Sequence, residues 1–252
     1  MTLPNQTIQT LKDLRLKAMA LAFEEQRKNP VFAEQSFDAR VDYLAMAQMD
    51  FQKNSKQQRL HRQAKLRINA CLEDIDYSSS RGLNRDVMNN LSTCDYIPNK
   101  QNVIITGPTG TGKTWIACAL GLAAVRKDYS VLSIRLARLF EEFQIAQGDG
   151  TLQRYRNKLT KFDLLIIDDW ALAPVTAIGR HELLELIDER MNAGSLIITS
   201  QLPVDKWHDY LGEATIADAI LDRVVQRAHS IELHGDSMRK IDLSLPSNQE
   251  DK

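Results

Sequence analysis

The fold of this chain is indicated first by the run Val103-Ile104-Ile105-Thr106-Gly107-Pro108-Thr109-Gly110-Thr111-Gly112-Lys113-Thr114. It matches the pattern G-x-x-x-x-G-K-[ST] without a departure. A short β-branched apolar run enters the loop, and a helix-forming stretch, residues 115–125, leaves it. Glycines let the backbone curl so that successive N–H groups point at phosphate oxygens, and the helix N-terminus adds partial positive charge. We therefore predict a phosphate-binding loop from Gly107, Pro108, Thr109, Gly110, Thr111, Gly112, Lys113 and Thr114.

Two side chains of this loop have their own chemistry. Lys113 can reach the β- and γ-phosphates of a nucleotide, and the Thr114 hydroxyl can ligate Mg²⁺. The alternative is a plain glycine turn between a strand and a helix. The complete match in a strand–loop–helix context favours the phosphate loop, so we expect the chain to bind ATP with Mg²⁺.

A second signal lies farther along the chain, where Leu164-Leu165-Ile166-Ile167 is followed by Asp168 and Asp169. In phosphate-loop enzymes the first acid after such a strand holds Mg²⁺, and the second polarises the attacking water. The alternative is that both carboxylates merely end a strand in a turn. Coupled to an intact phosphate loop, the pair favours the catalytic interpretation.

Strands and helices alternate from residue 101 onward, which predicts an α/β fold with a parallel sheet covered on both faces. The candidate strands are residues 103–106, 131–134, 164–167, 196–199 and 231–233. The fourth of them ends in Ser200 and Gln201. A polar side chain there would lie between the third and first strands, near the γ-phosphate, unless it is an ordinary polar strand end.

The first 70 residues look all-helical. Ile8, Leu11, Ala18 and Leu21 fall near one face at helical spacing, and residues 29–30, Asn-Pro, end that helix. We predict a helical domain over 1–70, a connector on the adenine side over 71–100, a phosphate-loop domain over 101–246 and a tail over 247–252.

Basic residues dominate the end of the helical region, because no acidic residue occurs between positions 51 and 72. The basic residues that matter here are Lys53, Lys56, Arg59, Arg62, Lys65 and Arg67. Their spacing gathers them on one broad side of a helix. A solvated basic face is the alternative, but the absence of interleaved acids favours phosphate contacts.

Composition adds few constraints. The chain has 252 residues and a formal net charge of −1. Cys71, Cys94 and Cys118 show no metal-ligand spacing, so we expect them to be reduced thiols. The first residues lack the pattern of a signal peptide, and no apolar run is long enough to span a bilayer. We expect a cytoplasmic protein without a membrane partner.

Together these segments resemble the AAA+ ATPases of the initiator and helicase-loader clade, and in particular the IstB-like helpers of insertion-sequence transposition. The resemblance covers nearly the whole chain. It rests on Leu83-Asn84-Arg85, residues 93–97 (Thr-Cys-Asp-Tyr-Ile), the phosphate loop, residues 163–169, residues 199–203 (Thr-Ser-Gln-Leu-Pro), residues 219–223 (Ala-Ile-Leu-Asp-Arg) and residues 235–239 (Gly-Asp-Ser-Met-Arg).

The resemblance implies a role for each matching residue. Lys113 and Thr114 would be the Walker A pair, Asp168 the Walker B metal ligand, and Asp169 the catalytic acid. Sensor I would be Ser200 or Gln201, the arginine finger Arg223, and sensor II Arg239. Read without the resemblance, Arg223 is equally an ordinary surface ion pair with Asp218 or Asp222.

The resemblance also implies partners. Members of this clade carry an extra helix after the second strand that touches DNA, and Arg154, Arg156, Lys158 and Lys161 occupy that place. We expect a homo-oligomer that binds duplex DNA largely independently of sequence and assists a transposase. The alternative is a helicase loader with the same chemistry. A small-molecule kinase would have no use for Arg223 or for the basic helical domain.

Overall fold

The computed structural model describes residues 3–77 and 81–238, which fall into two compact units. The first unit comprises residues 1–59 and the second residues 60–252. The division falls within a long helix, α3 (Phe37–Ala64), before the expected domain limit at residue 70. In the described part of the chain, no helix combines the length and the apolar character that crossing a membrane requires.

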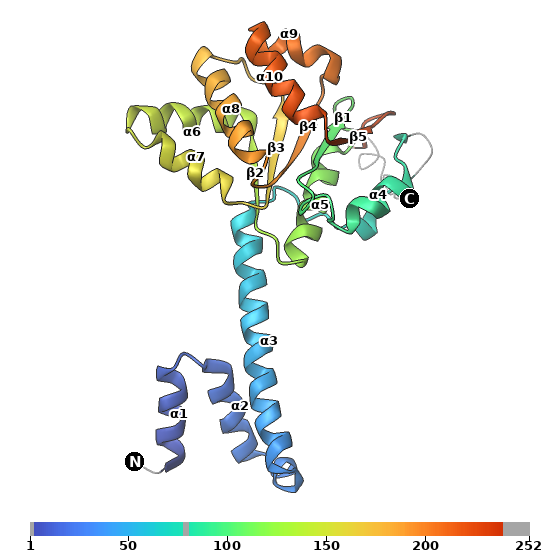
Figure 1. Cartoon of the computed structure of the whole chain (residues 1–252). Coiled ribbons are helices and arrows are strands. Elements are labelled where there is room, and N and C mark those ends of the chain that lie inside the picture. The colour runs from blue at the N-terminus through green and yellow to red at the C-terminus, as the bar shows by residue number, and fades with distance from the viewer. Residues whose placement is uncertain (1–2, 78–80, 239–252) are drawn as a thin grey trace, which may run out of the picture. The chain divides into compact units, whose positions relative to one another are not determined.

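The first unit is helical, as the sequence predicts. It contains α1 (Leu3–Asp13), α2 (Lys17–Lys28), the short η1 (Pro30–Glu34) and the first part of α3 (Figure 1). The single helix expected before residue 29 is wrong, because a turn over residues 14–16 separates α1 from α2. Arg15 has a φ of 62°, which a right-handed helix cannot accommodate.

Polar contacts hold α2 against α3 within this unit. The Gln48 side chain of α3 accepts hydrogen bonds from the backbone amides of Ala18 and Met19, at 3.1 and 3.2 Å. These amides belong to the first turn of α2, where a helix has no acceptors of its own. Farther along, Gln26 Nε2 donates to the Arg40 carbonyl over 2.7 Å.

The second unit is built on a sheet of five parallel strands. They are β1 (Asn102–Thr106), β2 (Val131–Arg135), β3 (Leu164–Trp170), β4 (Ser195–Ser200) and β5 (Ala228–Glu232). Their order in the sheet is β2-β3-β4-β1-β5 (Figure 1). This confirms the predicted α/β fold with five parallel strands, and it places the fourth strand between the third and the first, as expected.

Helices cover both faces of the sheet. Successive residues of a strand point to opposite faces, so each strand contributes side chains to both layers of the core. Val103 and Ile105 of β1 pack in one buried cluster and Ile104 packs in the other. The first cluster includes α4 (Arg85–Ser92), α5 (Lys113–Arg126) and residues beside η2 (Leu72–Asp74). The second includes α6 (Leu136–Gly148), α7 (Leu152–Thr160), α8 (Ala177–Arg190), α9 (Trp207–Leu211), which follows η4 (Val204–Lys206), and α10 (Ala214–Val225).

A buried arginine ties helices to the sheet on that second face. The Arg190 guanidinium donates to the carbonyls of Leu159, Phe162 and Ser195, at 2.7, 3.1 and 2.8 Å. Burial lowers the pKa of Arg190 to about 10, so the side chain stays charged at neutral pH. Its role is structural: it joins the ends of α7 and α8 to the start of β4.

Candidate nucleotide-binding site

The phosphate loop joins β1 to α5, and its glycines are required by its geometry. Gly107, Gly110 and Gly112 have φ values of 144°, 87° and 93°, a region that favours glycine. A Cβ on Gly107 would come within 2.4 Å of the Leu233 carbonyl oxygen. Side chains are therefore excluded where the backbone has to curl around a ligand.

Lys113 is held inside this loop. It is the first residue of α5, it is buried, and its ammonium donates to the carbonyls of Gly107 and Pro108 at 2.7 and 2.8 Å. A full positive charge thus lies under the curled backbone, where phosphate oxygens would approach. This placement fits the role expected for Lys113.

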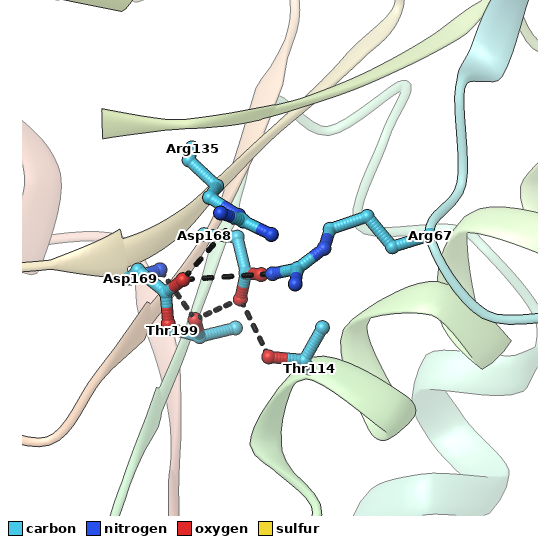
Figure 2. Close-up of polar contacts among 6 residues, drawn as sticks. All are labelled: Arg67, Thr114, Arg135, Asp168, Asp169 and Thr199. Carbon is cyan, nitrogen blue, oxygen red and sulfur yellow. Dashed lines mark hydrogen bonds and ion pairs between the residues drawn. The ribbon is translucent and has the colours of Figure 1, made fainter. Parts of the chain in front are cut away.

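Asp168 lies at the centre of the polar contacts beside the loop (Figure 2). Its side chain is 1% exposed. Its Oδ1 accepts hydrogen bonds from Thr114 at 2.8 Å and from Thr199 at 2.5 Å. The two residues expected to hold metal, Thr114 and Asp168, are therefore in contact. A hydroxyl and a carboxylate oxygen side by side are the hard donors that Mg²⁺ prefers, so the donor set fits that ion.

Asp169 reaches the same side of the sheet through an irregularity in β3. Successive side chains of a regular strand point to opposite faces, so two consecutive aspartates would separate. Asp169 instead has a φ of 60°, and the β3–β4 register shifts between Ile167 and Trp170. Its amide donates to Thr199 Oγ1 over 3.1 Å. Aspartate tolerates this left-handed conformation better than most residues.

Two arginines face these acids. Arg67 NH1 lies 2.9 Å from Asp168 Oδ2 and 3.5 Å from Asp169 Oδ2, and Arg135 Nε lies 3.7 Å from Asp169 Oδ2 (Figure 2). The sequence predicts Arg67 as a DNA contact, but the structure places it on the acids. The physical reason is that a buried carboxylate needs a nearby positive charge or it becomes costly.

A pocket of about 610 Å³ opens next to these groups, a size suited to a nucleotide. Loop and acid residues line one part: Thr109, Gly110, Gly112, Lys113, Thr114, Asp169 and Gln201. Ile68, Asn69, Asp74, Asp76, Arg81, Trp115 and Met238 line the rest. Part of the predicted connector thus borders the pocket. There Arg81 bridges the carbonyls of Asp76 and Thr111, at 2.7 and 2.9 Å.

The end of β4 distinguishes the two sensor I candidates. Ser200 is fully buried, and its hydroxyl contacts the carbonyls of Trp170 and Leu202, away from the pocket. Gln201 lines the pocket and accepts a hydrogen bond from Thr109 Oγ1 of the phosphate loop at 2.6 Å. Thr199, which sequence reasoning missed, is the β4 residue on Asp168. Its only signal in the sequence is a hydroxyl directly after the apolar residues 196–198.

Arg223 lies far from its own phosphate loop. It is on α10, whose Val224 carbonyl accepts a hydrogen bond from Asn102, the first residue of β1. The loop follows the other end of that strand, roughly 13 Å away at an ordinary rise per residue. The alternative prediction of an ion pair with Asp218 or Asp222 is wrong, because Arg223 Nε donates to Asp188 over 2.7 Å instead. Arg239, the sensor II candidate, lies outside the described residues.

The residues proposed to contact DNA divide into two groups. Exposed residues are Lys53, Lys56, Arg59, Arg62, Lys65, Arg154, Lys158 and Lys161. Arg156 is only 12% exposed and pairs with Glu182, Glu185 and Glu189, so it serves to join α7 to α8. On α3, steps of three residues turn by about 300°, so positions 53 to 62 spread over roughly half the circumference.

Comparisons with known proteins agree with this geometry. The family profile of the IstB-like ATP-binding proteins matches residues 9–245. The insertion sequence ATP-binding protein y4pL of Sinorhizobium fredii is 43% identical over 238 residues, which cover 94% of this chain and 97% of that protein. The ATP-binding protein of insertion sequence IS1162 from Pseudomonas fluorescens is 45% identical over 198 residues, covering 78% and 86%.

Solved structures share the fold at lower identity. DnaI superposes with a TM-score of 0.57 at 21% identity, covering 66% of this chain and 91% of that chain. AMPPCP-bound DnaA from Aquifex aeolicus gives 0.57 at 20%, covering 74% and 59%, and the DnaC helicase loader gives 0.54 at 14%, covering 68% and 99%. These likenesses show the AAA+ fold and confirm the fold that the sequence predicts.

Thr199 provides a test of the site. Replacing Thr199 by Val keeps its shape but removes the hydroxyl that donates to Asp168 and accepts from the Asp169 amide. Groups that orient a metal ligand typically contribute 10- to 100-fold, so we expect the Mg²⁺-dependent ATPase rate of T199V to fall by roughly that factor. Thr199→Ser keeps the hydroxyl and should stay within about threefold. A T199V enzyme that folds normally and works at the parental rate would remove Thr199 from the site.

Proposed function

The chain belongs to the IstB-like ATP-binding proteins, and from this premise we propose that it is an ATPase that oligomerises on DNA and assists a transposase. The observation that carries the proposal is the contact of Thr114 and Thr199 with one buried carboxylate, Asp168, beside a nucleotide-sized pocket that Thr114 and Asp169 line. A structural glycine turn would not need these three residues to converge.

ATP hydrolysis follows from the placement of the polar side chains. The curled loop and Lys113 would bind the phosphates, and Thr114 with Asp168 would hold Mg²⁺. When bound, this ion neutralises charge on the β- and γ-phosphate oxygens. Asp169, which is partly exposed and lines the pocket, would accept a hydrogen bond from the attacking water and orient it. Gln201, bonded to Thr109, would sense the γ-phosphate.

The position of Arg223 supports an assembly of several subunits. The side chain lies at the opposite edge of the sheet from its own phosphate loop, so it cannot stabilise charge on its own ATP. It is partly exposed and anchored by Asp188. We propose that it completes the site of a neighbouring subunit, where an added arginine is worth orders of magnitude in rate.

Partners follow from the relatives and from the surface charge. The two relatives named above are ATP-binding proteins of insertion sequences, which favours a transposition helper over a helicase loader. The loader structures support only the fold. We propose that exposed basic residues of α3 and α7 bind duplex DNA through its phosphates, and that the protein acts in the cytoplasm.

DNA binding should depend steeply on salt. We expect the joint replacement of Lys53, Lys56, Arg59 and Arg62 by Gln to flatten the plot of log affinity against log salt. Each lost phosphate contact removes about 0.9 from the slope. The matched control replaces Lys12, Lys17, Arg27 and Lys28, four exposed basic residues of α1 and α2, by Gln. Fluorescence anisotropy with random-sequence duplex DNA measures both. Equal slopes for the two variants would show that the α3 residues contact DNA phosphates no more than other exposed basic residues do.

Subunit mixing tests the assembly. Arg223→Ala and Lys113→Ala should each be inactive as ATPases, but a mixture of the two should regain part of the activity. Some interfaces would then pair an intact Lys113 with an intact Arg223. Asp188→Ala, which removes the partner of Arg223 but keeps the guanidinium, should stay active. A mixture that co-assembles on DNA yet stays inactive would contradict a finger acting between subunits.

A further inference from the structure

Arg67 is the arginine that contacts the proposed metal ligand Asp168, and the proposed mechanism leaves it without a role. We propose that Arg67 competes with the divalent cation for Asp168, so that it is a positioning residue that sets how much Mg²⁺ the ATP site requires. The proposal rests on the proposed function, because it concerns the same metal site. The proposal implies that the segment between α3 and η2, residues 65–71, regulates nucleotide binding.

The two oxygens of Asp168 have different partners (Figure 2). Oδ1 accepts hydrogen bonds from Thr114 and Thr199, which fill its two lone-pair directions. Oδ2 is the oxygen that faces Arg67, at 2.9 Å. A cation that Asp168 coordinates beside Thr114 therefore has to share Oδ2 with the Arg67 guanidinium, and two positive groups on one buried carboxylate oxygen repel each other.

The segment that carries Arg67 is fixed at its ends and open in the middle. Leu66 packs against Gly121 of α5, and Ala70 is fully buried. Between them, Ile68 and Asn69 line the nucleotide pocket, and the Arg67 side chain is 40% exposed. The guanidinium therefore has solvent to move into, while the next two residues line the pocket in which a nucleotide would bind. Ligand binding and release of Arg67 are coupled through this short stretch of chain.

Arg135 provides the matched control. It also places a guanidinium at this site, and its side chain is 51% exposed, but its ion pair is with Asp169 at 3.7 Å. Its removal lowers the positive charge of the site by the same amount as removal of Arg67. A general change of electrostatic potential predicts the same effect for both arginines, whereas competition at Oδ2 predicts an effect for Arg67 alone.

The experiment titrates Mg²⁺ into the full-length protein with a fluorescent ADP analogue and records the Mg²⁺ concentration at half-maximal nucleotide binding. For Arg67→Ala we expect this concentration to fall by roughly three- to tenfold, the range for loss of one hydrogen bond of ordinary net strength, because the Arg67 side chain is partly exposed to solvent. Arg135→Ala and Arg67→Lys should stay within about twofold of the parent.

The outcomes separate the two proposals. An unchanged or higher Mg²⁺ requirement in R67A, or an equal fall in R67A and R135A, overturns competition by Arg67 and leaves the ATPase proposal standing. A parent protein that binds no nucleotide, or binds it without regard to Mg²⁺, overturns the proposed metal site and the competition with it. Thermal unfolding of each variant confirms that it is folded. If R67A is not folded, Arg67→Gln takes its place, because it also removes the charge that faces Asp168 Oδ2 and should lower the Mg²⁺ requirement in the same way.

Discussion

The structure of the second unit depends on the hydrogen bonds and the counter-charge of one buried carboxylate, that of Asp168. A charge removed from water is costly unless it is paired and hydrogen-bonded. Here the partners come from three separate parts of the chain: Thr114 on α5, Thr199 on β4 and Arg67 after α3. Any rearrangement that separates these elements costs the carboxylate a hydrogen bond or its counter-charge. The same requirement that stabilises the fold therefore assembles the site.

The parallel sheet supplies the geometry that this carboxylate needs. Because all five strands run in the same direction, β1, β3 and β4 deliver the phosphate loop, the acids and Thr199 to one edge. The other edge receives the end of α10 with Arg223. One sheet thus presents the residues of the proposed phosphate site at one edge and Arg223 at the other, which suits the proposal that subunits complete each other's sites.

Sequence reasoning reached the elements with strong local signals. The phosphate loop, the apolar run before Asp168 and the alternation of strands and helices followed from periodicity and from the chemistry of phosphate binding. It missed features that depend on the tertiary structure. The left-handed Asp169 has no local signature, since Asp-Asp alone does not indicate a bulge. Arg67 looked like part of a basic stretch, because nothing in the sequence shows that Asp168 needs a counter-charge. The turn at Arg15 interrupts a helical pattern without Gly or Pro.

The central claim is that these groups hydrolyse ATP, and Asp169→Asn tests it most directly. Asn tolerates the left-handed backbone and keeps the shape of the side chain, but it cannot act as a carboxylate toward water. The measurement compares ATP binding and single-turnover hydrolysis, with Mg²⁺ present, for the parent and for D169N. We expect D169N to bind ATP within a few-fold of the parent and to hydrolyse it about 100-fold more slowly or worse. Hydrolysis by D169N at the parental rate would contradict it.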